Sequence, residues 1–323
     1  GAGRALPGAG APDGTGGEGA TLRCRSRELR RLMRALVFGE SGQVARELAR
    51  VAAVRGIEAR FLGRGAADLA DPEACARAVR AAEADVVVNA AAYTQVDQAE
   101  DEPGLAETVN AAAPGAIAAA ASARGVPLLH VSTDYVFDGR AGRPWREGDE
   151  TGPLSVYGAS KLAGERLVAA GNPDHTILRT AWVFSGHGRN FVRTMLTVGR
   201  GRGEMRVVGD QRGCPTWAGD IAAALWTIAA AWTAGRGRAG VFHYAGAPAV
   251  SWAEFAEAIF ARSGWPDRPR VVPIATREWP TKARRPANSV LDCAAIDAAY
   301  GLAQPDWREA LDGVVAEIGR AQG

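Results

Sequence analysis

The chain has 323 residues, of which 47% are hydrophobic and 23% are charged, and this composition is that of a globular protein with a substantial core. The formal net charge is only +2, so overall electrostatics do not favour nucleic acid or a membrane surface as a partner. No apolar run reaches the length that crosses a membrane. We therefore expect neither nucleic-acid nor membrane binding.

The cysteines and histidines, four of each, are dispersed along the chain. A disulfide framework or a zinc site would need clustered spacings that are absent here. We expect a reduced, cytoplasmic protein without a metal site.

Residues 1–33 are predicted to be a disordered extension. Gly, Ala and Pro dominate residues 1–22, and the basic stretch that follows has no apolar segment of the kind that a signal peptide carries. This extension is left out of the predicted fold.

From Arg34 onward, apolar runs alternate with segments of helical spacing. Uniformly apolar strands that alternate with helices are typical of a parallel sheet covered on both faces. The predicted fold class is α/β, a doubly wound parallel sheet of Rossmann type with a smaller C-terminal substrate-binding lobe. Strands are predicted over residues 34–39, 57–63, 85–92, 126–134 and 176–184, and helices over residues 40–56, 72–84, 104–125 and 157–171.

The expected domain organisation follows from where this alternation loosens. Residues 34–184 form the dinucleotide-binding domain, and residues 217–246, with a long apolar helix and a strand, return to it. Residues 185–216 and 247–323 form mainly the substrate-binding lobe. In such folds the ligand binds at the carboxyl ends of the strands, where this lobe would close the site.

A glycine-rich turn, GESGQVA at residues 39–45, follows the first strand. Its form is G-x-x-G-x-x-A: Gly39 permits the tight turn, Gly42 permits close approach of a pyrophosphate, and Ala45 permits close packing of helix and strand. The phosphates would lie on the N-terminal amides of the following helix. The turn residues expected to contact the dinucleotide are Gly39, Ser41, Gly42, Gln43 and Val44.

The end of the second strand bears on the choice of cofactor. Arg64 lies where an acidic residue would favour NADH, and it can instead meet the 2′-phosphate of NADPH. NADPH is therefore favoured, NADH stays possible, and the alternative for Arg64 is a solvated surface side chain. Further cofactor contacts are expected from Asp68 and Leu69 beside the adenine and from Ala90, Ala91 and Ala92 at a strand end.

The strongest single feature is the pair Tyr157 and Lys161. Residues four apart share one face of a helix, so the phenol and the ammonium can converge on one ligand. The chain has only two lysines among its 38 basic residues, which invites a chemical explanation for a retained lysine. A nearby ammonium lowers the pKa of a phenol and makes it a better proton donor. The alternative is a surface aromatic–cation pair.

A hydroxyl group precedes this helix at the end of a buried strand. Ser132 and Thr133 lie side by side in the sequence HVSTDYVFDG, and neighbours on a strand face opposite ways. We choose Thr133 as the residue that bonds the substrate carbonyl and the Tyr157 phenol, and Ser132 stays the alternative.

Seven segments, in chain order, resemble the dTDP-4-dehydrorhamnose reductases, a family of the extended short-chain dehydrogenase/reductase superfamily. The resemblance runs from about Arg34 to the end of the chain, and the middle segments are more specific than the glycine-rich turn or the Tyr–Lys pair. The segments are GESGQVA, NAAAYTQVDQAE, HVSTDYVFDG, SVYGASK, LRTAWVF, GDQRGCPT and RPANSVLD.

The resemblance implies a catalytic set of Thr133, Tyr157 and Lys161. NAD(P)H would deliver a hydride to C4 of dTDP-4-dehydro-L-rhamnose, Tyr157 would donate the proton, and the product would be dTDP-L-rhamnose. Lys161 would also bind the nicotinamide ribose, and Asn110 would support the site near the nicotinamide. The substrate contacts that the resemblance implies are Thr94, Val96, Thr133, Asp134, Trp182, Asn190, Arg193 and Arg285, with Arg284 beside it; the alternative for each arginine is a solvated charge.

One departure from some relatives concerns magnesium. Those relatives dimerise through a magnesium ion held by carboxylates, and Glu47 matches one ligand, whereas the other positions are matched to Gly219 and Cys293. A site poor in carboxylates binds a hard cation weakly. We therefore expect a monomer or weak homodimer without a bridging metal.

Three competing functions stay open. The chain can reduce another dTDP-4-keto-6-deoxysugar, since the Tyr–Lys pair does not select the sugar. It can be a non-catalytic NADP-binding regulatory subunit, although such proteins usually have lost part of the catalytic set. An epimerase with tightly held NAD is the third, and the specific segments disfavour it.

Overall fold

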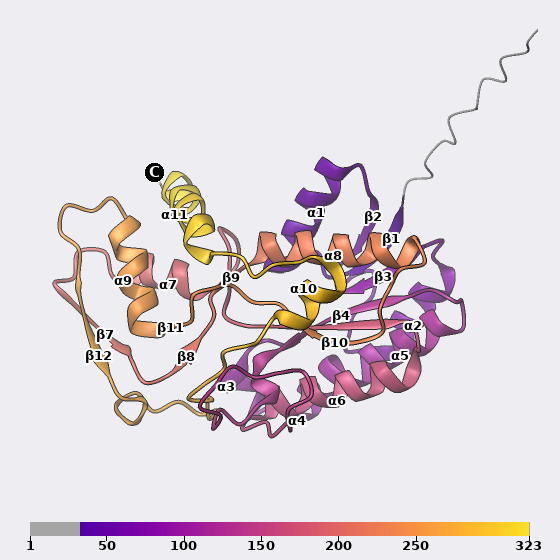
Figure 1. Cartoon of the computed structure of the whole chain (residues 1–323), viewed down its shortest axis with the longest axis horizontal. Helices are drawn as coiled ribbons and strands as arrows, with labels where there is room; N and C mark the ends of the chain where they lie inside the picture. The colour runs from indigo at the N-terminus through magenta and orange to yellow at the C-terminus, as the bar shows by residue number, and fades with distance from the viewer. Residues whose placement is uncertain (1–32, 323) are drawn as a thin grey trace, which may run out of the picture. The chain divides into compact units, whose positions relative to one another are not determined.

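The computed structural model describes residues 33–322, so the extension predicted for residues 1–33 lies outside the described residues except for Met33. A parallel six-stranded sheet, in the order β10-β5-β4-β3-β1-β2, is the centre of the described chain (Figure 1). Every neighbouring pair in it is parallel. The strands are β1 (Arg34–Phe38), β2 (Glu58–Leu62), β3 (Val86–Asn89), β4 (Leu128–Thr133), β5 (His175–Thr180) and β10 (Gly240–His243).

Helices cover both faces of this sheet, as Figure 1 shows. On one face lie α1 (Gln43–Arg55) and α8 (Ala218–Thr233), and on the other lie α2 (Pro72–Ala81), α5 (Ala113–Ser122) and α6 (Val156–Gly171). Strand β3 is buried along its whole length between these two layers. The predicted doubly wound α/β fold is confirmed.

Two predicted elements are wrong in detail. The strand predicted over residues 176–184 is interrupted, because Trp182 has a φ of 46°, which a continuous strand cannot accommodate. Strand β5 therefore ends at Thr180, and a separate β6 (Val183–Phe184) pairs with β9 (Thr216–Trp217). The helix predicted over residues 104–125 is likewise divided into α4 (Pro103–Glu107), a π-helical turn η1 (Thr108–Ala112) and α5.

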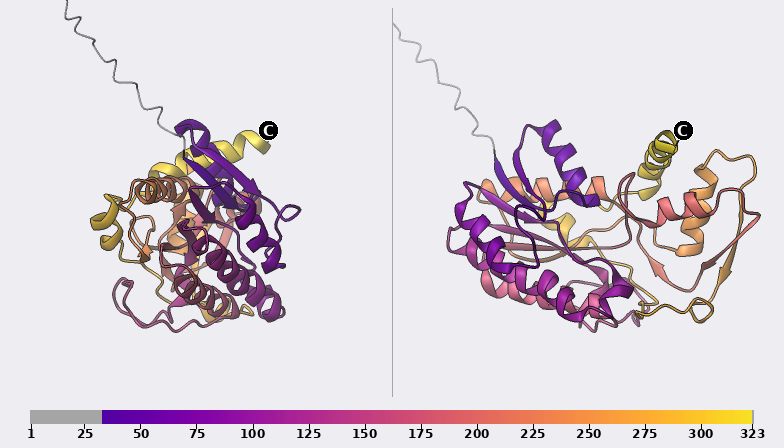
Figure 2. Two further views of the ribbon diagram at one scale, coloured as in Figure 1. Left: turned by 90° about the vertical axis from the view of Figure 1, so that its right-hand side faces the viewer. Right: turned by 180° about the vertical axis from the view of Figure 1, so that it is seen from behind.

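Most of the remaining described elements pack around a separate apolar cluster that includes Phe184, Phe255 and Trp307. The helix that contains Ile296 instead packs into the core beside the central sheet. These elements are seen from behind in Figure 2. The domain division predicted from the sequence stays a proposal, which this separate cluster supports. The helices are α7 (Phe191–Val198), α9 (Trp252–Arg262), α10 (Ala294–Tyr300) and α11 (Trp307–Gln322), with α3 (Val96–Ala99) elsewhere in the chain; the strands are β7 (Glu204–Val208), β8 (Arg212–Gly213), β11 (Val250–Ser251) and β12 (Arg270–Ile274).

Within residues 33–322, no helix is both long and apolar enough to span a membrane.

Candidate active site

The glycine-rich turn between β1 and α1 has the geometry of a dinucleotide-binding turn. Gly39 has a φ of 112°, which side chains rarely tolerate, and a β-carbon there would lie 3.5 Å from the backbone nitrogen of Ala91. Gly42 caps α1 without any side-chain hydrogen bond, and nothing lies within 4 Å of a β-carbon built on it. The first amides of α1 are thus open to an anion, and this cradle fits the pyrophosphate of a dinucleotide.

The side chain of Gln43 ties this turn to the segment before α7. Its Oε1 accepts hydrogen bonds from the Ser185 hydroxyl at 3.0 Å and from Asn190 Nδ2 at 2.9 Å. Asn190 also caps α7, since its Oδ1 accepts from the backbone N–H of Arg193 at 3.1 Å. The polar atoms of Asn190, expected to meet the substrate, are therefore engaged within the protein.

The π-helical turn η1 places Asn110 at the junction of two segments. Its Oδ1 accepts from the backbone N–H of Tyr93 at 2.8 Å, and its Nδ2 donates to the Tyr93 carbonyl and to the Ser160 hydroxyl. Helix α6 passes so close that a β-carbon at Gly164 would overlap the Asn110 carbonyl oxygen. Asn110 thus connects the loop after β3 to α6, and π-turns of this kind recur at functional sites.

Helix α6 directs the side chain of Lys161 toward β4 of the central sheet. The side chain of Ser155 caps the helix by accepting from the backbone N–H of Gly158 at 3.1 Å. Lys161 is 2% exposed, and its Nζ donates to the Val131 carbonyl at 2.7 Å and lies 3.3 Å from His130 Nε2. Burial lowers the pKa of Lys161 to about 8, against the opposing charge of Glu165.

Tyr157 lies one helical turn before Lys161 and packs edge-on against Tyr135, with ring centroids 5.8 Å apart. Burial raises the pKa of its phenol to about 12, and the hydrogen bond with the Thr133 hydroxyl is the leading influence in the opposite direction. Our expectation that Lys161 lowers this pKa is wrong for this structure. The reason is geometric, because the lysine amine is turned toward β4.

The two neighbouring hydroxyls at the end of β4 face different groups. Thr133 bonds with Tyr157 and donates to Asp134 Oδ1 at 3.1 Å, whereas Ser132 donates to the buried carboxylate of Glu165. Alternation along a strand accounts for this difference. The geometry supports Thr133, rather than Ser132, as the hydroxyl beside the phenol.

Asp134 is buried beside this hydroxyl, and burial raises the pKa of its carboxyl to about 7. Hydrogen bonds with Ser289 and Thr133 oppose that rise. A carboxyl with this pKa changes charge near neutral pH, next to the proton donor.

Trp182, which follows β5, has a strained backbone with a φ of 46°. Its ring stacks flat on Trp252, with centroids 3.4 Å apart and planes inclined by 4°. A β-carbon at Gly213 would overlap the Trp182 ring, and Trp252 Nε1 donates to Gln211 Oε1 at 3.2 Å. Trp252 was missed from the sequence, because nothing in its local pattern indicates a partner 70 residues earlier in the chain.

The other predicted contacts are scattered around this centre. Arg285 forms a bidentate ion pair with Asp97 at 2.8 and 3.0 Å, so a pyrophosphate would have to share its guanidinium. Arg193 donates to the Gly186 carbonyl at 2.7 Å. The remaining predicted positions divide by burial into the exposed Arg64, Asp68, Thr94 and Arg284, the partly buried Ala90, Ala91, Ala92 and Val96, and the buried Leu69 and Val44.

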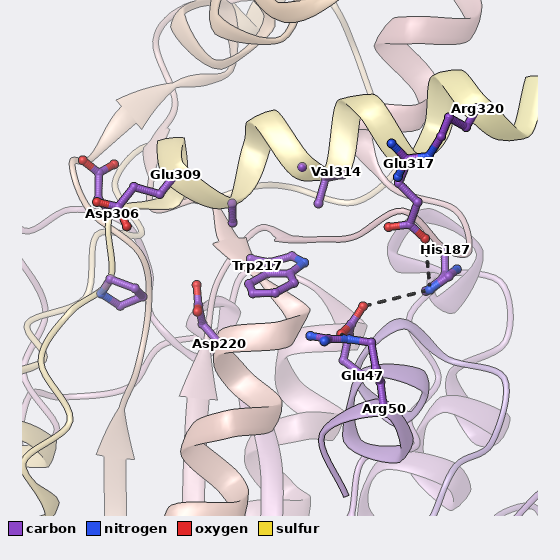
Figure 3. A pocket seen from close by; sticks show the side chains of 13 residues that line it. Glu47, Arg50, His187, Trp217, Asp220, Asp306, Glu309, Val314, Glu317 and Arg320 are labelled. Carbon is purple, nitrogen blue, oxygen red and sulfur yellow. Dashed lines mark hydrogen bonds and ion pairs between the residues drawn. The ribbon is translucent and has the colours of Figure 1, made fainter. Parts of the chain in front are cut away.

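A pocket of about 590 Å³ lies apart from these groups, between α1, α8 and α11 (Figure 3). In it His187 Nε2 lies 4.0 Å from Glu47 and 3.4 Å from Glu317. Cys293, matched above to a metal-ligand position, does not line this pocket; its thiol faces the Ala245 and Leu291 carbonyls.

The second carboxylate near His187, besides Glu47, belongs to Glu317, which the sequence analysis did not single out. No group of three or more His, Cys, Asp or Glu side chains among residues 33–320 is arranged to hold a metal ion. The absence of a magnesium-bridged dimer stays a prediction.

Comparisons with known proteins give matches over most of this chain. A family model described as RmlD substrate binding domain matches residues 33–320. The dTDP-4-dehydrorhamnose reductase of Burkholderia thailandensis is 47% identical over 298 residues, covering 88% of this chain and 99% of its own. The enzyme of the same name from Sinorhizobium fredii is 46% identical over 283 residues, covering 86% and 95%.

Two solved structures are similar over almost the same length. A dTDP-4-dehydrorhamnose reductase from Clostridium acetobutylicum has a TM-score of 0.83 and 36% identity, covering 89% of this chain and 100% of that one. The reductase from Bacillus anthracis, in complex with NADP, has a TM-score of 0.82 and 31% identity, covering 88% and 99%.

Proposed function

The chain belongs to the RmlD family of dTDP-4-dehydrorhamnose reductases, and from this premise we propose that it reduces the C4 ketone of dTDP-4-dehydro-L-rhamnose to give dTDP-L-rhamnose. One observation carries the proposal: Tyr157 and Lys161 of α6 meet the end of β4 at Thr133 and Val131, and the open glycine-rich turn follows β1 at the same edge of the parallel sheet. Carbonyl reduction needs a proton donor and an adjacent dinucleotide, and this end of the sheet supplies a place for both.

The cofactor is NADPH, with NADH as the alternative, and it supplies the hydride when bound. The amides that follow Gly42 would hold its pyrophosphate, Arg64 its 2′-phosphate and Lys161 its ribose. The open space above Gly42 supports this assignment.

The proton comes from the protein. Tyr157 gives its phenolic proton to the oxygen of the reduced carbonyl, and Thr133 orients that phenol through their hydrogen bond. The pKa of about 12 keeps the phenol protonated until negative charge develops on the substrate oxygen. The stacked Trp182 and Trp252 would form one wall of the sugar pocket.

The test combines the protein, NADPH and dTDP-4-dehydro-L-rhamnose generated in situ. Loss of nicotinamide absorbance with formation of dTDP-L-rhamnose supports the proposal. Tyr157→Phe should keep cofactor binding while turnover falls by about 10²-fold or more. The matched control is Tyr300→Phe, because that phenol bonds only the Arg238 backbone among the described residues and should leave turnover unchanged. Full activity of Tyr157→Phe would remove Tyr157 from the mechanism.

Two other functions are outcomes of related assays. A panel of dTDP-4-keto-6-deoxysugars tests whether another sugar is preferred, since the pocket wall rather than the Tyr–Lys pair selects the sugar. A regulatory subunit would bind NADPH without turning over any of them.

The finer points of assembly and location are also proposals. We propose a monomer or weak homodimer without a bridging metal, and sedimentation with and without chelator tests it. We propose a cytoplasmic location, which the three unpaired, buried cysteines of the described chain (Cys75, Cys214 and Cys293) support.

A further inference from the structure

A buried chain of hydrogen bonds runs from β3 to Lys161. Asn89 and His130 are both 0% exposed, and they are register partners on the neighbouring strands β3 and β4. Asn89 Nδ2 lies 3.1 Å from His130 Nδ1, and His130 Nε2 lies 3.3 Å from Lys161 Nζ. The proposed reaction does not assign a role to either Asn89 or His130.

The orientation of the Asn89 amide is decided by a backbone group. The N–H of Ala91 lies 3.2 Å from Asn89 Oδ1, and a backbone N–H can only donate, so that atom is the amide oxygen. The Asn89 NH₂ group therefore faces His130 Nδ1 and donates to it. Because Nδ1 is the acceptor, the proton of a neutral His130 ring lies on Nε2.

His130 is neutral in this setting, because burial holds its pKa well below the usual range. Its Nε2–H then points at Lys161 Nζ. A neutral amine can accept this hydrogen and still donate to the Val131 carbonyl at 2.7 Å. An ammonium has no lone pair, so donor would face donor.

The charged groups around Lys161 do not remove the preference of His130 for a neutral amine at this position. Glu165, one turn further along α6, favours the ammonium, but its carboxylate is paired with Arg179 and accepts from Ser132. Burial lowers the pKa of Lys161 to about 8, and a donor presented by His130 would act in the same direction.

We propose that Asn89 and His130 are a positioning pair for Lys161, in which Asn89 selects the Nε2–H tautomer of His130 and His130 donates to the lysine as a neutral amine. This inference rests on the proposed function only for the importance of Lys161. It makes Lys161 a side chain whose charge changes closer to neutral pH than that of an ordinary lysine.

The chain is suited to a direct measurement, because Lys161 and Lys282 are its only lysines. We would label lysine with ¹³C at the ε-carbon in the full chain, assign the two signals with Lys282→Arg, and titrate both. Lys161 should titrate at about 8, and the half-exposed Lys282 supplies the reference signal in the same spectrum. Histidine ¹⁵N spectra of the unmodified chain should report His130 as the Nε2–H tautomer.

Two variants distinguish the effect of the His130 tautomer on the pKa of Lys161 from the direct effect of a new charge at position 89. In Asn89→Asp the carboxylate accepts from Nδ1–H, Nε2 becomes an acceptor for an ammonium, and the Lys161 midpoint should rise by about one unit or more. The same change in a His130→Met background places an equal charge without the imidazole, so the midpoint should move much less.

The proposal is overturned if His130 carries its proton on Nδ1 in the unmodified chain. It is also overturned if Asn89→Asp shifts Lys161 equally in both backgrounds, or if Lys161 titrates together with Lys282. The tautomer spectrum needs no variant, so it decides the matter even where Asn89→Asp fails to fold. None of these readouts requires the keto sugar, so failure of the proposed reaction is recognised separately.

Discussion

The buried ion pair beneath the active site should dominate the stability of its surroundings. Arg179 on β5 donates to Glu165 on α6 twice, from Nε at 2.9 Å and from a terminal nitrogen at 2.6 Å, and both side chains are 4% exposed. The guanidinium also lies over the Phe137 ring at 5.1 Å. Arg179→Met would fill a similar space and leave the carboxylate without its cation.

The size of the effect follows from what remains around Glu165. After the substitution the Ser132 hydroxyl is the hydrogen-bond donor left among the described residues. A buried ion that loses its partner destabilises a protein by about 3–5 kcal/mol, which is a large share of a total of about 5–15 kcal/mol. Replacing both ions by apolar residues, Arg179→Met with Glu165→Leu, should recover most of that loss.

The assay is equilibrium unfolding in urea, followed by fluorescence and circular dichroism. The matched control is Arg143→Met, because Arg143 pairs with Asp149 but is 53% exposed, so water screens the pair and the loss of stability should be much smaller. The reasoning is refuted if Arg179→Met is as mild as Arg143→Met, or if the double variant is less stable than the single one.

Two further predictions concern the same region. Burial raises the pKa of Asp134 to about 7, so the folded state keeps a proton that the unfolded chain releases near pH 4, and stability should fall as pH rises from 4 through 7. Asp134→Asn removes this titration. Between pH 5 and pH 8, the free energy of unfolding of the variant, measured in urea, should therefore rise by about 2–4 kcal/mol relative to that of the parent. A difference between the two proteins that does not change with pH would contradict this prediction. Gly164→Ala would overlap the Asn110 carbonyl and should destabilise by about 1–3 kcal/mol, with lower NADPH affinity by calorimetry. Gly313→Ala, which has open space around it, should be neutral or slightly stabilising, and equal thermal shifts in the two variants would argue against close packing at Gly164.

Local patterns in the sequence were enough to predict the fold class and the centre of the site. Apolar runs alternating with helical segments determine a parallel sheet, because buried strands need no polar face. The spacing of Tyr157 and Lys161 determines that they share one face of α6, because helical geometry depends on neighbours alone. The turn at Gly39 is likewise local, since only its own backbone requires a positive φ.

Tertiary structure alone decided what those side chains face. Lys161 turns to β4, where its amine meets the Val131 carbonyl and His130, and the register between β3 and β4 places Asn89 beside His130. Trp182 breaks its strand and stacks on Trp252, which lies 70 residues later. Such contacts depend on how distant segments are brought together, and no periodicity within a single segment records that.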